Sequence, residues 1–132
     1  MSRSVFIGID IATSNVRAVA IDRTGTPLAR ASEPLAQVIK GADKSATQDS
    51  KSWITAVDKV LTHLCKQLIE EGFIPKSLLI SATSGTFVLC DKNYAPIAPA
   101  AMYNDGRASD PLARAAVVIK DLKQSGPFVF AN

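Results

Sequence analysis

The stretch IGIDIATSNVRAVAID, residues 7–22, decides how the rest of this sequence is interpreted. Two apolar runs flank a short turn of small residues, which is the pattern of a β-hairpin. The first run carries a carboxylate, Asp10, just before the turn, and the second run ends in another, Asp22. A hairpin alone needs no acid at the end of its first strand. The position of Asp10 therefore raises the question of a chemical role for this turn.

A tight turn of small residues can bind phosphate, because its backbone N–H groups can be directed at phosphate oxygens. Thr13 and Ser14 add hydroxyl donors to this turn. Asp10 could hold Mg²⁺, which is usually bound through one or two carboxylates and keeps several waters. Arg17 could reach phosphate, or the alternation of the strand could turn it to solvent. An ordinary hairpin, in which Asp10 only accepts N–H bonds from the turn, explains the same residues.

The composition indicates one globular domain that binds neither nucleic acid nor membrane. The chain has 132 residues, 47% of them hydrophobic, and its net charge of +3 is scattered rather than clustered. Nucleic-acid binding would favour clustered Lys and Arg, and no stretch approaches the ~18 apolar residues of a membrane span. Cys65 and Cys90 lack metal or redox spacing, so we expect buried free thiols in a cytoplasmic protein.

The order of the predicted elements favours a mixed sheet. Strands are expected at about 4–11, 15–22 and 26–34 as an antiparallel meander, followed by a polar, irregular stretch over 35–48. A helix follows, started by Asp49 or Ser50 and ended by Gly72. Its apolar stripe, which Trp53 begins and anchors to the sheet, recurs at helical spacing: Trp53, Val57, Val60, Leu61, Leu64, Leu68 and Ile69.

Further strands are predicted after this helix at 78–82, beside the first strand, at 87–90 and at about 100–103. A second helix is expected to open at Asp110. Three strands, a helix, more strands and a helix match an α/β, ribonuclease H-like (actin-like ATPase) mixed sheet with flanking helices. A doubly wound parallel sheet fits less well, because helices would separate nearly all of its strands.

Three motifs in register resemble the FGGY carbohydrate kinases. Residues 7–22 are similar to the family's phosphate-binding opening, roughly G-I-D-x-G-T-[ST]-x-x-[RK]-x-x-x-x-D. TQDSKSWI, residues 47–54, resembles E-Q-D-P-x-x-W-W, and PAAMYNDGRAS, residues 99–109, resembles P-A-I-x-W-N-D-x-R-A. The matching positions are Gly8, Ile9, Asp10, Thr13, Ser14, Arg17, Asp22, Gln48, Asp49, Trp53, Asn104, Asp105 and Arg107.

The resemblance implies ATP and Mg²⁺ as cofactors and a small sugar as substrate. It implies phosphate binding by Asp10, Thr13, Ser14 and Arg17, with Asp10 also at the metal. The residues implied for the sugar are Thr83, Ser84, Gly85, Asn104 and Asp105. Residues 1–132 correspond to the N-terminal portion of one kinase domain. The second domain and the catalytic base are expected beyond Asn132, so no catalytic residue is assigned here.

Two positions and one segment depart from the family pattern. Ala12 replaces a glycine of the turn, which could hinder close approach of the backbone to phosphate. SATSGT, residues 81–86, is a small, hydroxyl-rich version of the family's sugar-contacting segment and is more similar to the ribulokinase-like branches. The same residues could simply form a turn between strands. Tyr103 stands where the family often has tryptophan, and its ring could flank sugar or fill core.

We therefore predict a fragment of an ATP-dependent kinase for a ketopentose, ribulose or xylulose, or a related sugar or polyol. By itself the chain is expected to be inactive, and its exposed domain surface could lead to homo-oligomers. One alternative is a non-catalytic, actin-like remnant that binds nucleotide or a partner. Another is a ribonuclease H-like nuclease, which would need further acids to bind two metal ions, and LLISATSG, residues 78–85, has none.

Overall fold

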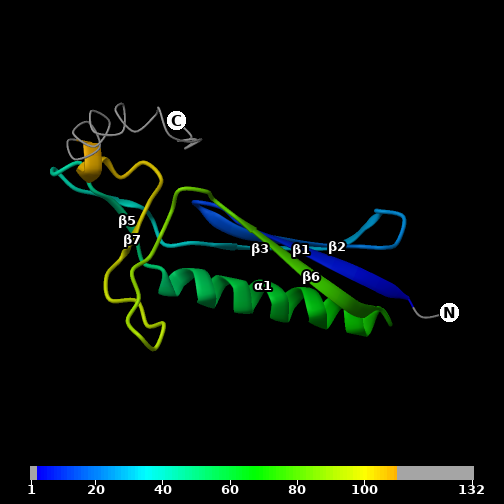
Figure 1. Ribbon diagram of the computed structural model, residues 1–132. Coiled ribbons are helices and arrows are strands. Elements are labelled where there is room, and N and C mark those ends of the chain that lie inside the picture. The colour runs from blue at the N-terminus through cyan, green and yellow to red at the C-terminus, as the bar shows by residue number, and fades with distance from the viewer. Residues whose placement is uncertain (1–2, 110–132) are drawn as a thin grey trace, which may run out of the picture.

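The computed structural model describes residues 3–109, in which a four-stranded sheet carries a long helix on one face (Figure 1). The strands are β1 (Ser4–Ile11), β2 (Asn15–Ile21), β3 (Pro27–Pro34) and β6 (Ile74–Ala82), in the order β3-β2-β1-β6. β1, β2 and β3 are antiparallel neighbours, and β6 runs parallel to β1. The predicted meander, the strand added beside β1 and the mixed sheet are confirmed.

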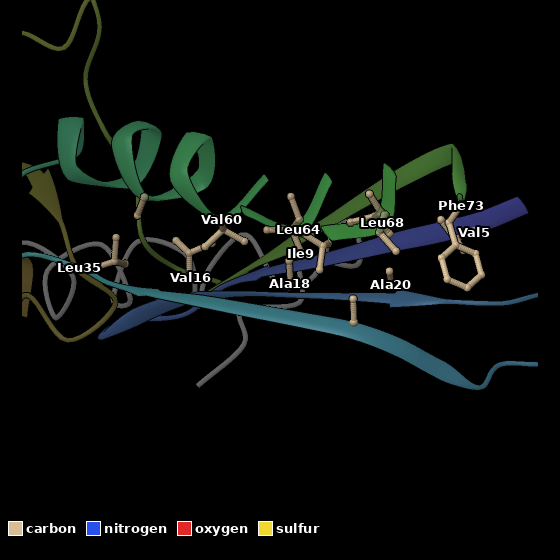
Figure 2. Packing of buried hydrophobic residues seen from close by; sticks show 13 residues of the cluster. Val5, Ile9, Val16, Ala18, Ala20, Leu35, Val60, Leu64, Leu68 and Phe73 are labelled. Atoms are coloured by element: carbon tan, nitrogen blue, oxygen red, sulfur yellow. The ribbon is translucent and has the colours of Figure 1, made fainter. Parts of the chain in front are cut away.

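The core lies between this sheet and α1 (Lys51–Glu70), as Figure 2 shows. Side chains alternate along a strand, so Val5, Ile7 and Ile9 of β1 face the helix while Asp10 faces the opposite side. Trp53 packs against the same core, which confirms its predicted place at the start of the buried stripe. The cluster comprises Val5, Ile7, Ile9, Val16, Ala18, Ala20, Ala29, Leu35, Ala56, Val60, Leu64, Leu68 and Phe73.

Both ends of α1 are capped, close to where the sequence predicts. Ser50 occupies the N-cap position, but the first-turn N–H of Lys51 donates to the Asp49 carboxylate at 3.0 Å. At the other end Gly72 has a φ of +76°. The N–H of Phe73 donates to the carbonyl of Leu68 at 2.8 Å, which closes a Schellman motif.

A smaller sheet lies at one end of the molecule and was predicted only in part. It contains β4 (Ile39–Lys40), β5 (Ala46–Gln48) and β7 (Ala100–Ala101), in the order β4-β5-β7 (Figure 1). The prediction that residues 35–48 are irregular is therefore wrong for β4 and β5. These strands are short, and they form because distant segments pair, which local sequence does not reveal.

The strand predicted at 87–90 is also wrong. Phe87 and Cys90 make isolated bridges to Ala101 and Pro96 instead. The Asp91 carboxylate accepts the N–H groups of Asn93 and Ala95, so the chain turns back immediately after Cys90, and residues 87–90 pair only at their two ends.

Both cysteines are free, but only one is partly covered. Cys65 is half-buried on α1, whereas Cys90 is exposed, so the prediction of a buried thiol is wrong at Cys90. Cys90 lies in the turning segment rather than in the large sheet. The helix predicted from Asp110 lies outside the described residues. Among residues 3–109, no helix combines the length and the apolar character needed to span a membrane.

Replacing Leu64 by alanine should destabilise the fold strongly. Leu64 is fully buried at the centre of the contact between α1 and the sheet. Truncating such a leucine costs about 2–5 kcal/mol, because the cavity it leaves collapses only in part. The matched control is Ile69→Ala on the same helix, where the side chain is 67% exposed. Urea unfolding should show a large decrease in the free energy of unfolding for Leu64→Ala and a much smaller decrease for the control. Equal decreases would contradict the observed packing.

Candidate functional site

The turn between β1 and β2 leaves two backbone N–H groups unused. The N–H of Ala12 donates to the carbonyl of Asn15 at 3.0 Å, so Thr13 and Ser14 form a two-residue loop. Within residues 3–109, the N–H groups of Thr13 and Ser14 have no hydrogen-bond acceptor. No residue of this turn has a positive φ, so alanine at position 12 fits its backbone without strain. The two amides are available to an anion.

Asp10 and Arg17 lie directly opposite each other on β1 and β2, on the sheet face away from α1. An Arg17 NH2 group donates to Oδ2 of Asp10 at 2.7 Å, and both side chains are about half exposed. On the other side of Asp10 the register neighbour on β6 is Ser81, not a second acid. These three side chains line an open hollow of about 620 Å³. A two-metal nuclease site would require further acids beside Asp10, but its register neighbours are Arg17 and Ser81.

The second carboxylate of the hairpin, Asp22, closes the turn between β2 and β3. Its Oδ1 accepts the hydroxyl of Thr24 at 2.6 Å and the N–H groups of Thr24 and Thr26. The Thr24 hydroxyl and the Thr26 N–H hold the pKa of the Asp22 carboxyl below its ordinary value. Asp22 thus has a local structural task, unlike Asp10.

The structure brings together the two loops that contain the predicted sugar residues. The N–H of Phe87 donates to the carbonyl of Ala101 at 3.0 Å, and the N–H of Tyr103 donates to Oγ1 of Thr86 at 3.2 Å. At Gly85, where φ is +73°, an added Cβ would lie 3.4 Å from Cβ of Tyr103. The two loops are therefore in direct contact.

The predicted sugar residues differ in exposure. Thr83 follows β6 and lies beside the β1–β2 turn, since its N–H donates to the carbonyl of Ile11 at 3.1 Å. Ser84, Gly85 and Asn104 are exposed. Ala12 and Thr83 both line a hollow of about 90 Å³, together with Trp53 and Thr86. The β1–β2 turn and the hydroxyl-rich loop, residues 81–86, thus line the same hollow.

Asp105 is committed to the protein's own backbone and to Arg107. Its carboxylate accepts the Arg107 guanidinium at 2.6 Å and the N–H of Ala46, at the start of β5, at 3.1 Å. The Arg107 guanidinium, with help from the Ala46 N–H, holds the pKa of the Asp105 carboxyl well below its ordinary value of 3.8. The Asp105 side chain is only 10% exposed. Its observed role is to attach β5 to the segment that follows β7.

One buried polar residue next to the turn was not assigned a role from the sequence. Gln48, the last residue of β5, is 1% exposed, and its amide contacts the carbonyl of Thr13. Its match to the second family motif was the available signal, but a motif match alone does not show what the side chain contacts.

The sequence matches the FGGY family of carbohydrate kinases, N-terminal domain, over residues 5–121. This chain belongs to that family. The predicted family is thereby confirmed, and the β1–β2 turn lies near the start of the matching region.

Known FGGY relatives share both sequence and fold with this chain. A xylulose kinase from Staphylococcus epidermidis is 29% identical over 109 residues, which cover 83% of this chain and 22% of the relative. The crystal structure of xylulose kinase from Rhodospirillum rubrum has a TM-score of 0.78 at 26% identity, covering 84% of this chain and 22% of that one. Plasmodium falciparum glycerol kinase with ADP reaches a TM-score of 0.78 at 15% identity, over 88% and 23% of the two chains, which shows a shared fold.

These likenesses confirm the predicted actin-like fold class. The chain spans about a fifth of the length of the curated relatives it matches.

Replacing Asp105 by asparagine should remove a pH-dependent part of the stability. A carboxyl whose pKa is lowered by folding stabilises the protein above its unfolded pKa, and this contribution is lost as the pH falls through the folded pKa. We expect Asp105→Asn to be less stable than the wild type at neutral pH, with the difference shrinking below about pH 4. Urea unfolding between pH 2.5 and 7 measures the difference in free energy of unfolding between the variant and the wild type. Asp58→Asn, on the exposed side of α1, is the control. A constant difference across this range would show that Asp105 does not contribute through its charge.

Proposed function

We propose that this chain is the phosphate-binding, N-terminal part of an ATP-dependent sugar kinase. The observation that carries the proposal is the β1–β2 turn, where two uncommitted backbone amides lie next to a half-exposed carboxylate, in a chain of the FGGY family. Thr13 and Ser14 would donate to phosphate oxygens from both backbone and hydroxyl groups. Anions bind readily at such clusters of backbone N–H groups.

Asp10 fits a role as an Mg²⁺ ligand. It has a half-exposed carboxylate, and Mg²⁺ bound to phosphates needs only one or two protein carboxylates, with waters completing its shell. When bound, Mg²⁺ would neutralise charge that develops on the transferring phosphoryl group. Arg17 would then exchange its present partner, the Asp10 carboxylate, for a phosphate oxygen.

For the substrate we propose a ketopentose, ribulose or xylulose, or a related sugar or polyol. The xylulose kinases among the relatives support this class. Thr83, Ser84 and Gly85 would contact the sugar from the hydroxyl-rich loop, and Asn104 from the neighbouring loop. Asp105 would contribute there mainly by fixing that loop, since its carboxylate already accepts the Arg107 guanidinium.

The general base and the opposing wall of the cleft would come from a second domain. Phosphoryl transfer depends largely on holding ATP and the acceptor hydroxyl in line, which requires groups on both sides of the cleft.

We also propose that the enzyme is cytoplasmic and takes small sugars, with no role for nucleic acid or membrane. The surface facing the second domain would favour self-association of the isolated chain.

The isolated chain should bind Mg·ATP without phosphorylating sugar, whereas the longer kinase that we propose should do both. Calorimetry with ATP and Mg²⁺ measures the first property. ADP release with ribulose, xylulose and glycerol measures the second, with sugar-free reactions as the control. Sugar-dependent turnover by the isolated chain would contradict the proposed division of the active site. Failure of both proteins to bind ATP would contradict the proposed function itself.

In the longer kinase, Asp10→Asn should lower the turnover number by roughly 100-fold or more, because losing a group that stabilises transition-state charge has effects of this order. The KM for the sugar should change little, since we propose that Asp10 acts on the metal and phosphate rather than on the sugar. Asp58→Asn, an exposed carboxylate on α1, is the matched control and should behave as wild type. An unchanged turnover number in the Asp10 variant would remove Asp10 from the metal site.

A further inference from the structure

We infer that Gln48 is a positioning residue, which orients the Ser14 amide for phosphate by holding the peptide between Thr13 and Ser14 in place. The inference rests on the proposed function because that function supplies the phosphate. The hydrogen bond from Gln48 to Thr13 is observed in the structure. Gln48 lies on β5, in the smaller sheet, and reaches across to the β1–β2 turn of the larger one.

The amide of Gln48 is almost fully buried and bonds three separate segments. Its Nε2 donates to the carbonyls of Thr13 at 2.9 Å and Ala36 at 2.5 Å. Its Oε1 accepts from Nε1 of Trp53 at 2.8 Å. The two carbonyls can only accept and the indole N–H can only donate, so the orientation of the amide is fixed. A primary amide is the side-chain group that offers two donors and an acceptor in this arrangement.

The bond to Thr13 determines where the Ser14 N–H points. A trans peptide is planar, with its C=O and N–H on opposite sides, and the described residues contain no cis peptide. Because the Thr13 carbonyl points toward the buried Gln48, the N–H of Ser14 points the opposite way. Ser14 is exposed, and this N–H is one of the two in the turn without an acceptor. Holding the carbonyl inward therefore presents the amide outward.

Gln48 is itself held by elements on either side. Trp53 fixes the amide oxygen from the first turn of α1 and packs on the main core. At the other end of β5, the N–H of Ala46 donates to the Asp105 carboxylate, and the carbonyl of Ala46 accepts from Met102. The Thr13 carbonyl is thus bound by a side chain that hydrogen bonds hold in place at its own amide and at the other end of β5.

The test compares wild type, Gln48→Met and Gln48→Glu in the 132-residue chain. Methionine has a similar length and no amide, while glutamate keeps the acceptor for Trp53 and loses both donors. The matched control is Val60→Ala, which should destabilise the core on α1 and whose apolar side chain makes no hydrogen bond to the turn. Calorimetry with Mg·ATP and with Mg²⁺ and tripolyphosphate gives affinity, and ¹⁵N NMR follows the Thr13 and Ser14 amides. The longer kinase gives the KM for ATP and for sugar.

We expect both Gln48 variants to bind tripolyphosphate about tenfold or more weakly, the loss typical of a misplaced hydrogen bond to a charged group. Faster motion of the Ser14 amide should accompany this loss, with the KM for ATP raised and the KM for sugar unchanged. Val60→Ala should lower the melting temperature without changing affinity. Affinity within twofold of wild type in a folded Gln48 variant would overturn the inference.

Two further outcomes separate this inference from the proposed function. If neither Gln48 variant folds, the wild type decides: a Ser14 amide resonance that does not shift on adding Mg²⁺ and tripolyphosphate overturns the role given to Gln48. If the wild type binds neither ATP nor tripolyphosphate, the proposed function fails. In that case the positioning role is still tested without ligand: unchanged motion of the Ser14 amide in the Gln48 variants would overturn it as well.

Discussion

The contact between α1 and one face of the sheet is the constraint on which the other features depend. It requires Val5, Ile7 and Ile9 of β1 to face the helix. Because strand side chains alternate, a shift of one residue would exchange the two faces completely. The same alternation places Asp10 and Arg17 on the other face, beside the turn. Burial of apolar side chains thus decides where the charged groups of the candidate site are found.

Local patterns were enough to predict the hairpin and the helix, whereas pairings between distant segments were not visible in the sequence. The apolar stripe from Trp53 to Leu68, with the start and stop signals on either side of it, predicted α1 close to its observed bounds, although Ile69 is exposed; two short turns predicted the meander. β4 and β5 were missed because their partners, including Ala101, lie elsewhere in the chain. For the same reason the sequence does not reveal that the Asp105 carboxylate, which the resemblance assigns to sugar, accepts the Ala46 N–H and the Arg107 guanidinium.

The ion pair between Asp10 and Arg17 is compatible with a site that must change partners. Both side chains are about half exposed, and exposed ion pairs contribute only about 0–1 kcal/mol to stability. Opening such a pair costs little, so in the function that we propose phosphate would attract Arg17 and leave Asp10 free for Mg²⁺. A fully buried pair in this position would resist that exchange, because breaking it would leave an uncompensated charge.

The smaller sheet connects the two halves of the candidate site. Asp105, at one end of this connection, binds the N–H of Ala46 and belongs to the segment that carries Asn104. Gln48, at the other end of the same short strand, binds the turn carbonyl of Thr13. β5 therefore makes hydrogen bonds both to the loop with the predicted sugar residues and to the β1–β2 turn. Both connections are hydrogen bonds of largely buried side chains, whereas Ser14, Ser84 and Asn104, which we propose to meet ligand, are exposed. This arrangement separates the supporting hydrogen bonds from the side chains that we propose to bind phosphate and sugar.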